Sequence, residues 1–92
     1  MNKTSRQLER HFKGIANHRR IDILFLIKRL DGMTLDDIAK QIGGNFKTIS
    51  EHTRRLVQAG LVNKNYSGRS VKHSLTPYGK KIISFVETFS HS

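Results

Sequence analysis

The feature that most restricts the fold is a pair of helical patterns separated by only three residues. Residues 34–42 place apolar side chains at the spacing of an amphipathic helix, namely Leu35, Ile38, Ala39 and Ile42. After Gly43-Gly44-Asn45, a second such pattern runs from about Phe46 to Ala59, and Gly60 can supply the left-handed residue that ends it. Two helices joined by a short turn that contains glycine are typical of a helix-turn-helix. We therefore predict this motif over about residues 34–59.

Two more helices are expected before this motif. The first spans about Ser5 to Ala16, and the second spans about His18 to Leu30, with Asn17 as a capping residue between them. The second is apolar on nearly every side, so we expect it to be the central buried element. Gly32 follows its end.

A hairpin and a final helix complete the pattern. Residues 61–66 and 70–75 are predicted to be short strands on either side of Ser67-Gly68-Arg69, and Thr76-Pro77 begins a helix that runs to about residue 90. The fold class is therefore mainly α with a small β-hairpin wing. We predict a winged helix-turn-helix in the order α-α-α-α-β-β-α, as a single domain over residues 1–92 with the wing at about 61–75.

Positive charge is concentrated in the second half of the chain. The 92 residues carry a formal net charge of +10, with 17 Lys and Arg against 7 Asp and Glu. Between Asn45 and Lys81 there are eight basic residues and one acid, Glu51. Such segregation favours a polyanionic partner, with nucleic acid as the first candidate and an anionic membrane surface as the second.

The helix expected over 46–59 has one polar side that is suited to the major groove, which admits a single helix. Arg54 and Arg55 can bind phosphate or guanine, and Glu51 can accept a hydrogen bond from a cytosine amino group. In the wing, Arg69 could enter the adjacent minor groove. The candidate DNA-binding residues are Asn45, Lys47, Thr48, Ser50, Glu51, Arg54, Arg55, Lys64, Arg69 and Lys72.

Two segments give the chain a resemblance to the ArsR-type winged helix-turn-helix regulators over nearly all of its length. They are Ile15-Ala16-Asn17-His18-Arg19-Arg20-Ile21-Asp22-Ile23-Leu24, and Lys47-Thr48-Ile49-Ser50-Glu51-His52 continuing through Ala59-Gly60-Leu61-Val62 to Leu75-Thr76. The resemblance implies a repressor that binds a palindromic operator as a homodimer, with Ser50 and Glu51 facing bases. It also implies that the first and last helices, at about 5–16 and 77–90, form the dimer. Their apolar residues are then the candidate interface: Leu8, Phe12, Ile15, Ile82, Phe85, Val86 and Phe89.

The chain departs from the family at several positions. Thr53 stands where the family usually has leucine, and His18 where proline is common. The cysteine pair that metal sensors of this type carry on the third helix is missing, because the chain has no cysteine. Glu87 and His91 could chelate an ion together with His11 of a partner, but ordinary polar residues near a chain end are the better interpretation. We expect no metal and no cofactor, with His52 a half-buried hydrogen-bonding residue and His73 a packing residue.

Other function classes are less well supported by the sequence. No nucleophile, metal triad or phosphate-binding loop is recognisable, so we do not expect an enzyme. The alternatives are a winged-helix protein-interaction module and an architectural DNA-binding protein without sequence preference. RNA binding is a weaker option, because no aromatic stacking platform is apparent. The longest apolar run is Ile23 to Ile27, and no apolar signal core follows Met1, so we expect a cytoplasmic protein.

Overall fold

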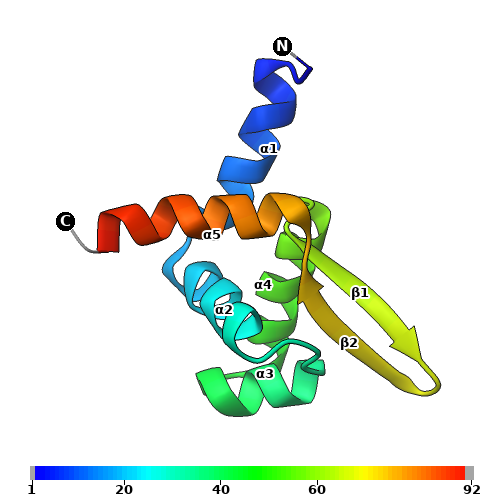
Figure 1. Cartoon of the computed structure of the whole chain (residues 1–92). Helices are drawn as coiled ribbons and strands as arrows, with labels where there is room; N and C mark the ends of the chain where they lie inside the picture. The colour runs from blue at the N-terminus through cyan, green and yellow to red at the C-terminus, as the bar shows by residue number, and fades with distance from the viewer. Residues whose placement is uncertain (1, 91–92) are drawn as a thin grey trace.

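The computed structural model describes residues 2–90 and confirms the expected order of elements (Figure 1). The elements are α1 (Ser5–Ile15), α2 (His18–Arg29), α3 (Leu35–Ile42), α4 (Phe46–Gln58), β1 (Val62–Ser67), β2 (Ser70–Leu75) and α5 (Pro77–Ser90). Most boundaries lie within one residue of those predicted, which is as close as hydrogen-bond criteria define them. The arrangement is a winged helix-turn-helix.

The core is built around α2, as its continuous apolar pattern predicts. Ile23 and Leu24 are completely buried and Ile27 is 1% exposed. α2 packs against every other helix and against β2, so it touches all layers of the fold. Within residues 2–90, no helix is long and apolar enough to cross a membrane.

Local hydrogen bonds set the starts of the helices. The side-chain oxygen of Asn17 accepts from the backbone N–H groups of Arg19 and Arg20, which confirms its predicted capping role at α2. Thr34 forms a reciprocal capping box with Asp37 at the start of α3. These caps satisfy the free N–H groups of each first turn, and they fix where the chain changes direction.

The hairpin is tied to the helical body through the turn between α2 and α3. The backbone N–H of Gly32 donates to the carbonyl of His73 at 3.0 Å, and the N–H of His73 donates to the carbonyl of Met33 at 2.8 Å. The His73 ring is 3% exposed, and its Nδ1 lies 2.9 Å from the same Met33 oxygen. His73 is therefore a packing residue, as expected. Gly68 has a φ of +61°, which a two-residue hairpin turn can require at its first position.

One prediction about an apolar residue is wrong. The spacing of apolar residues over 46–59 predicts that Phe46 packs against α2 and α3, but it is 50% exposed. It is the first residue of α4, and helical side chains lean toward the N-terminus, so its ring projects past the end of the helix. On α5 the deeply buried residue is Ile83, while Phe85 and Phe89, the candidate interface residues, are more than half exposed.

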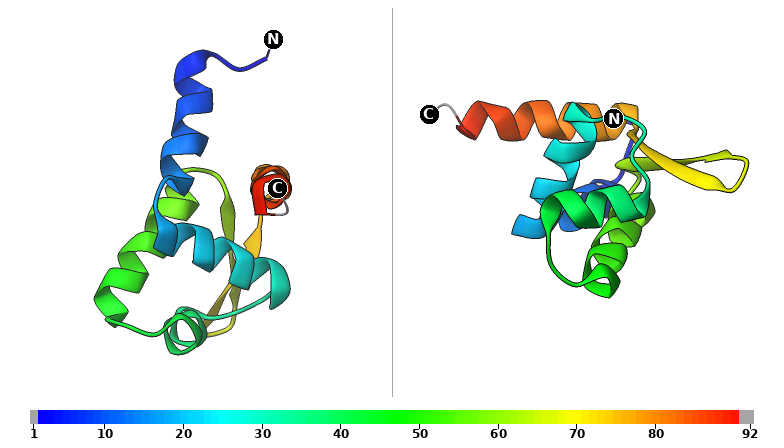
Figure 2. Two further views of the ribbon diagram at one scale, coloured as in Figure 1. Left: turned by 90° about the vertical axis from the view of Figure 1, so that its left-hand side faces the viewer. Right: turned by 90° about the horizontal axis from the view of Figure 1, so that it is seen from below.

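Beyond the core, α1 and α5 leave the body in different directions. α1 contacts α2 and α4 only near its C-terminal end, and the rest of the helix projects outward (Figures 1 and 2). α5 packs against α2 and β2, and its N-terminal end lies at the base of the hairpin. Both helices therefore present surface that the rest of the chain does not cover.

The start of α5 is fastened to the end of α4. The Thr76 hydroxyl donates to the carbonyl of Gly60 at 2.6 Å and accepts from the N–H of Gly79 at 2.9 Å. A Cβ added at Gly79 would overlap the backbone carbonyl oxygen of Leu61. Close approach of the two segments therefore requires glycine at this position.

Gly79→Ala should destabilise the protein, although alanine is the better helix former by about 1 kcal/mol. The overlap is with backbone atoms that cannot rotate away, so we expect a net loss of about 1–3 kcal/mol in the free energy of unfolding. Urea denaturation followed by circular dichroism measures this change. The exposed neighbour Lys80→Ala is the matched control and should stay within about 0.5 kcal/mol of the parent protein. Equal stability of the two variants would contradict the close approach.

Candidate nucleic-acid interface

The rotation of α4 about its axis is fixed by its buried side. Ile49, Thr53 and Leu56 are 0–2% exposed, and the Thr53 hydroxyl donates to the carbonyl of Ile49 at 2.9 Å. The turn before α4 contains Gly43 and Gly44, whose φ angles are +79° and +104°. With one side buried and the preceding turn fixed, the opposite side of α4 must face outward.

The structure places nearly all of the predicted α4 contacts on this outward surface. Ser50 is half-buried, and the other candidates are exposed: Asn45, Lys47, Thr48, Glu51, Arg54 and Arg55. Asn45 has a second task that the sequence analysis did not assign. Its Oδ1 accepts the N–H of Thr48 at 3.2 Å and so caps α4. The amide nitrogen of Asn45 takes no part in this cap and can contact a nucleic acid.

Glu51 is bound by the two arginines that follow it on the helix. Arg54 holds the carboxylate with two hydrogen bonds, one of them from Nε to Oε2 at 2.9 Å, and Arg55 Nε donates to Oε1 at 3.1 Å. The hydrogen bonds from Arg54 are the main reason that the pKa of Glu51 falls to about 2. The cluster gathers two guanidinium groups around a single carboxylate. These three hydrogen bonds occupy most of the acceptor positions of the carboxylate, so the arginines compete with a cytosine amino group for Glu51.

His52 connects α4 to α2 on the flank of the same helix. It is half-buried, and its Nδ1 accepts from Arg20 Nε at 3.3 Å. Burial lowers its pKa, and the nearby charge of Arg20 lowers it further, so both favour the neutral ring. This confirms the interpretation of His52 as a hydrogen-bonding residue.

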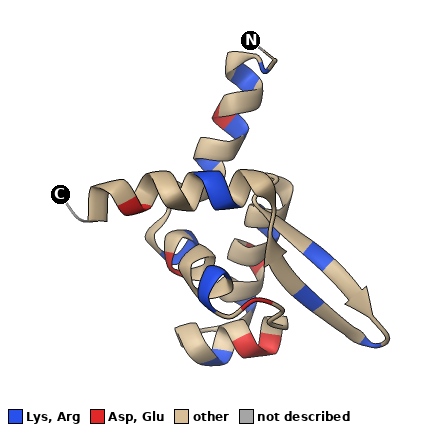
Figure 3. Cartoon of the chain, viewed as in Figure 1, with Lys and Arg blue, Asp and Glu red and all other residues tan. Residues whose placement is uncertain are grey.

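The three basic residues of the wing are exposed but do not share one face. Lys64 lies opposite His73 in the register and Lys72 lies opposite Asn65. Side chains alternate between the two faces of a strand, so these two lysines project from opposite faces of the hairpin. Arg69 lies in the turn at its tip. Figure 3 shows basic positions spread along the hairpin, with acidic residues gathered instead at the start of α3.

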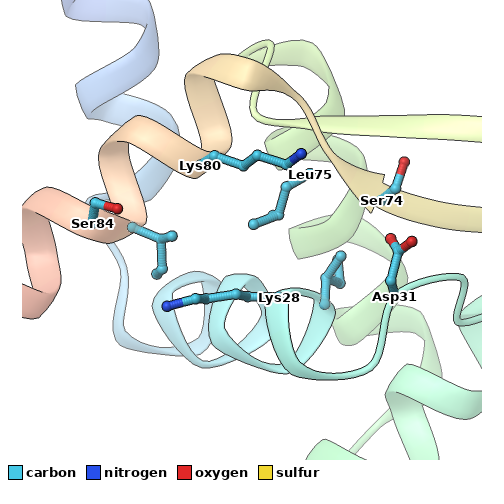
Figure 4. Close-up of a pocket in the computed structure, with 8 residues that line it drawn as sticks. Lys28, Asp31, Ser74, Leu75, Lys80 and Ser84 are labelled. Carbon is cyan, nitrogen blue, oxygen red and sulfur yellow. The ribbon is translucent and has the colours of Figure 1, made fainter.

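A cavity of about 600 Å³ lies away from α4, between α2, β2 and α5 (Figure 4). Lys28, Lys80 and Asp31 line it together with Ser74, Ser84 and apolar side chains. Lys28 is also paired with Glu87 at 2.6 Å. The lining of this cavity carries both positive and negative charges, unlike the cationic side of α4.

The candidate dimer residues fall into two groups. Phe12, Phe85 and Phe89 are 53–64% exposed, and the last two pack edge to face with ring centroids 5.1 Å apart. Leu8, Ile82 and Val86 are partly buried. Ile15 was predicted at the interface, but it is 8% exposed and belongs to the core. It therefore has little surface left for a partner.

The histidines considered as metal ligands are placed differently from one another. His11 is 5% exposed, its Nδ1 lies 2.6 Å from the carbonyl of Ala59, and its ring stacks on Tyr78 at 4.9 Å. His91 lies outside the described residues. Within residues 2–90, no cluster of three or more His, Asp or Glu side chains could hold a metal ion.

The role of Arg20 was not predicted from the sequence. Its Nη1 donates to the carbonyls of Lys13 and Gly14, both at 3.3 Å, so it joins the end of α1 to α2 and His52. The contact of His11 with Ala59 was missed as well, because the two residues are 48 positions apart. The one signal in the sequence was that His11, a polar residue, lies on the apolar side of the first helix.

Comparison with known proteins identifies related families and folds. The model of the MarR family matches residues 16–69. A homodimeric winged helix-turn-helix DNA-binding domain of Mycobacterium bovis, a possible ArsR-family transcriptional regulator, is 23% identical with a TM-score of 0.83, over 99% of this chain and 90% of that one. HlyU from Vibrio cholerae is 22% identical with a TM-score of 0.83, over the full length of both chains.

A further similar structure is MepR, a transcription regulator of the Staphylococcus aureus multidrug efflux pump MepA. It is 23% identical with a TM-score of 0.75, over 92% of this chain and 68% of MepR. No curated protein sequence matches the chain. At these identities the solved structures establish the shared fold, whereas the family model covers more than half of the chain.

The Glu51 cluster yields a pH prediction. The Glu51 carboxylate should stay ionised until the pH falls to about 2, and in Arg54→Gln its pKa should rise toward the ordinary value of 4.5. Because the folded-state pKa lies below the unfolded value, the stabilising contribution of this pair is present above about pH 4.5 and disappears as the pH falls toward 2. Carbon-detected NMR of the Glu51 carboxyl measures both values. Titration near pH 4.5 in the parent protein would show that the cluster does not form.

Proposed function

The chain belongs to the MarR family, and we propose that it is a homodimeric repressor that binds double-stranded DNA in a sequence-specific manner. The single observation that carries this proposal is the outward side of α4. It is exposed, cationic and fixed in direction by the buried residues Ile49, Thr53 and Leu56 behind it. A helix held in this way can be inserted into the major groove without rearrangement.

Within the groove, the contacts divide by chemistry. Arg54 and Arg55 bind phosphate or guanine, while Lys47, Thr48, Ser50 and the Asn45 amide contact bases or phosphates beside them. Glu51 holds the two arginines in place in the free protein, and it becomes available to a cytosine where an arginine moves to DNA. In the wing, Arg69 reaches the minor groove, and Lys64 and Lys72 add attraction from the two faces of the hairpin.

Dimerisation follows from the uncovered helices. The exposed rings of Phe12, Phe85 and Phe89 lie on α1 and α5, and a second copy would remove them from water. A symmetric dimer would place two α4 helices about 34 Å apart, to meet successive major grooves of a palindromic operator. We further propose an ArsR-type regulator that works in the cytoplasm as a single DNA-binding domain, without metal, cofactor or enzymatic activity.

Loss of both arginines of the cluster should weaken DNA binding strongly. Because Arg54→Gln with Arg55→Gln would leave Glu51 as an unpaired negative charge, the variant should also carry Glu51→Gln. We expect the affinity for a random duplex at low salt to fall at least about tenfold, because one or more charge-assisted hydrogen bonds are lost. The slope of log affinity against log salt should fall by about 0.9 for each phosphate contact removed.

Fluorescence anisotropy with labelled duplex measures both quantities. The matched control is Lys80→Gln with Lys81→Gln, which removes two positive charges from α5 and should change the affinity much less. If the two multiple variants bind duplex equally well, the major groove does not receive α4. Binding by the parent protein to an acidic protein but not to duplex would instead support an interaction module.

Phe85→Glu should dissociate the dimer. A charge placed at a desolvated apolar contact costs several kcal/mol, so we expect the dimer dissociation constant to rise about a hundredfold. Sedimentation equilibrium measures the constant. Tyr66→Glu places the same charge on an exposed ring of the wing and should leave it unchanged. A dimer that tolerates Phe85→Glu, or one that Tyr66→Glu disrupts equally, would rule out α5 as the interface.

A further inference from the structure

A second cavity, of about 330 Å³, lies where the end of α1 meets α2 and α4. Four of its lining side chains are cationic: Arg10, Lys13, Arg20 and Arg55. No aspartate or glutamate lines it. Figure 2 shows the three helices converging at the base of α1, away from the cavity between α2, β2 and α5.

A close helix contact brings these cations together. A Cβ at Gly14 would overlap the Cβ of Ala59, so α1 can approach the end of α4 only because residue 14 is glycine. At this distance, side chains from three separate helices border one space. Like charges repel, so such a gathering is unfavourable unless an anion occupies it or solvent screens it.

Two of the four charges have no carboxylate partner. The guanidinium of Arg10 forms no hydrogen bond or ion pair with any residue in the range 2–90. The partners of Arg20 are the carbonyls of Lys13 and Gly14 and the ring of His52. The α1 carbonyls offset part of the Arg20 charge through the negative end of the helix dipole, but they are not anions.

The other two charges are paired outside the cavity. Lys13 contacts Glu9 at 3.2 Å, and Arg55 contacts Glu51, which it shares with Arg54. Both acids lie away from the lining. The positive charge of Arg20 is also felt by His52, whose pKa is lowered first by burial and then by this neighbour. The cavity therefore has a positive potential.

We propose that this cavity binds a phosphate group or a similar oxyanion. Guanidinium groups bind phosphate through paired N–H donors, and Gln58 adds an amide donor at the edge. The phosphate can come from two sources. One is the DNA backbone next to the groove that α4 enters, and this source rests on the proposed function. The other is a small anion from solution.

The first experiment uses inorganic phosphate and the full chain without DNA. Phosphate is titrated at constant ionic strength while amide NMR shifts of Gly14, Gln58 and Ala59 are followed. We expect saturable shifts, weakened about fivefold or more in Arg10→Gln, since one charged donor is lost. Arg10 is the residue to change because its guanidinium forms no hydrogen bond or ion pair within residues 2–90, whereas Arg20 holds the end of α1.

The matched control is Lys80→Gln, which removes one positive charge from the other cavity and should leave phosphate binding unchanged. Shifts that do not saturate, or that persist equally in Arg10→Gln, would overturn the proposal. Because no DNA is present, this result stands whether or not the protein binds duplex.

The second experiment identifies the source. If the phosphate belongs to DNA, Arg10→Gln weakens duplex binding and lowers its salt slope by about 0.9, and inorganic phosphate competes with duplex. If it belongs to a small anion, Arg10→Gln leaves duplex affinity in the absence of phosphate unchanged. A loss of duplex affinity equal in Arg10→Gln and Lys80→Gln would mean general charge attraction and would overturn the DNA source.

Discussion

The backbone of Ala59, Gly60 and Leu61, directly after α4, holds α1 and α5 in place and so fixes the layout of the molecule. The Ala59 carbonyl contacts the buried ring of His11 on α1, and the Gly60 carbonyl accepts from Thr76 at the start of α5. Gly14 and Gly79 lie so close to this segment that a single added carbon would overlap it. Three residues thus hold the helix with the cationic surface against the two helices that project from the body.

This junction explains how DNA binding and self-association can be related in so small a chain. α4 faces outward with its arginines, while α1 and α5 carry the exposed phenylalanines. A rigid connection between them means that the geometry of a dimer would set the separation of its two groove-facing helices. The Glu51 cluster then limits the positions of the arginines before any duplex is bound.

Much of the fold could be predicted from the sequence because its signals are local. The caps at Asn17 and Thr34, the glycines at 43, 44 and 60, and the continuous apolar pattern of α2 all act within a few residues. The exposed position of Phe46 could not be read in the same way, since a helical pattern does not say where the packing partners end. For the same reason, the pattern did not show that Ile15 packs in the core.

The polar contacts of the site were harder to predict. Three residues at i, i+3 and i+4 on α4 indicated a charged face, but the pattern did not say that Glu51 would be bound by both arginines. The opposite orientation of Lys64 and Lys72 depends on the register of the hairpin. The roles of Arg20 and His11 depend on tertiary contacts between distant segments.

Sequence reading by α4 is tested most directly by selecting bound molecules from a pool of random duplexes at low and moderate salt and sequencing them. A dimeric protein that reads DNA sequence with α4 should enrich an inverted repeat whose half-sites are one helical turn apart, about 10 base pairs. The repeat should still be enriched at moderate salt, where phosphate contacts alone lose most of their affinity. Salt-sensitive binding without any enriched sequence, or no binding at either salt, would contradict a dimeric protein that reads DNA sequence with α4.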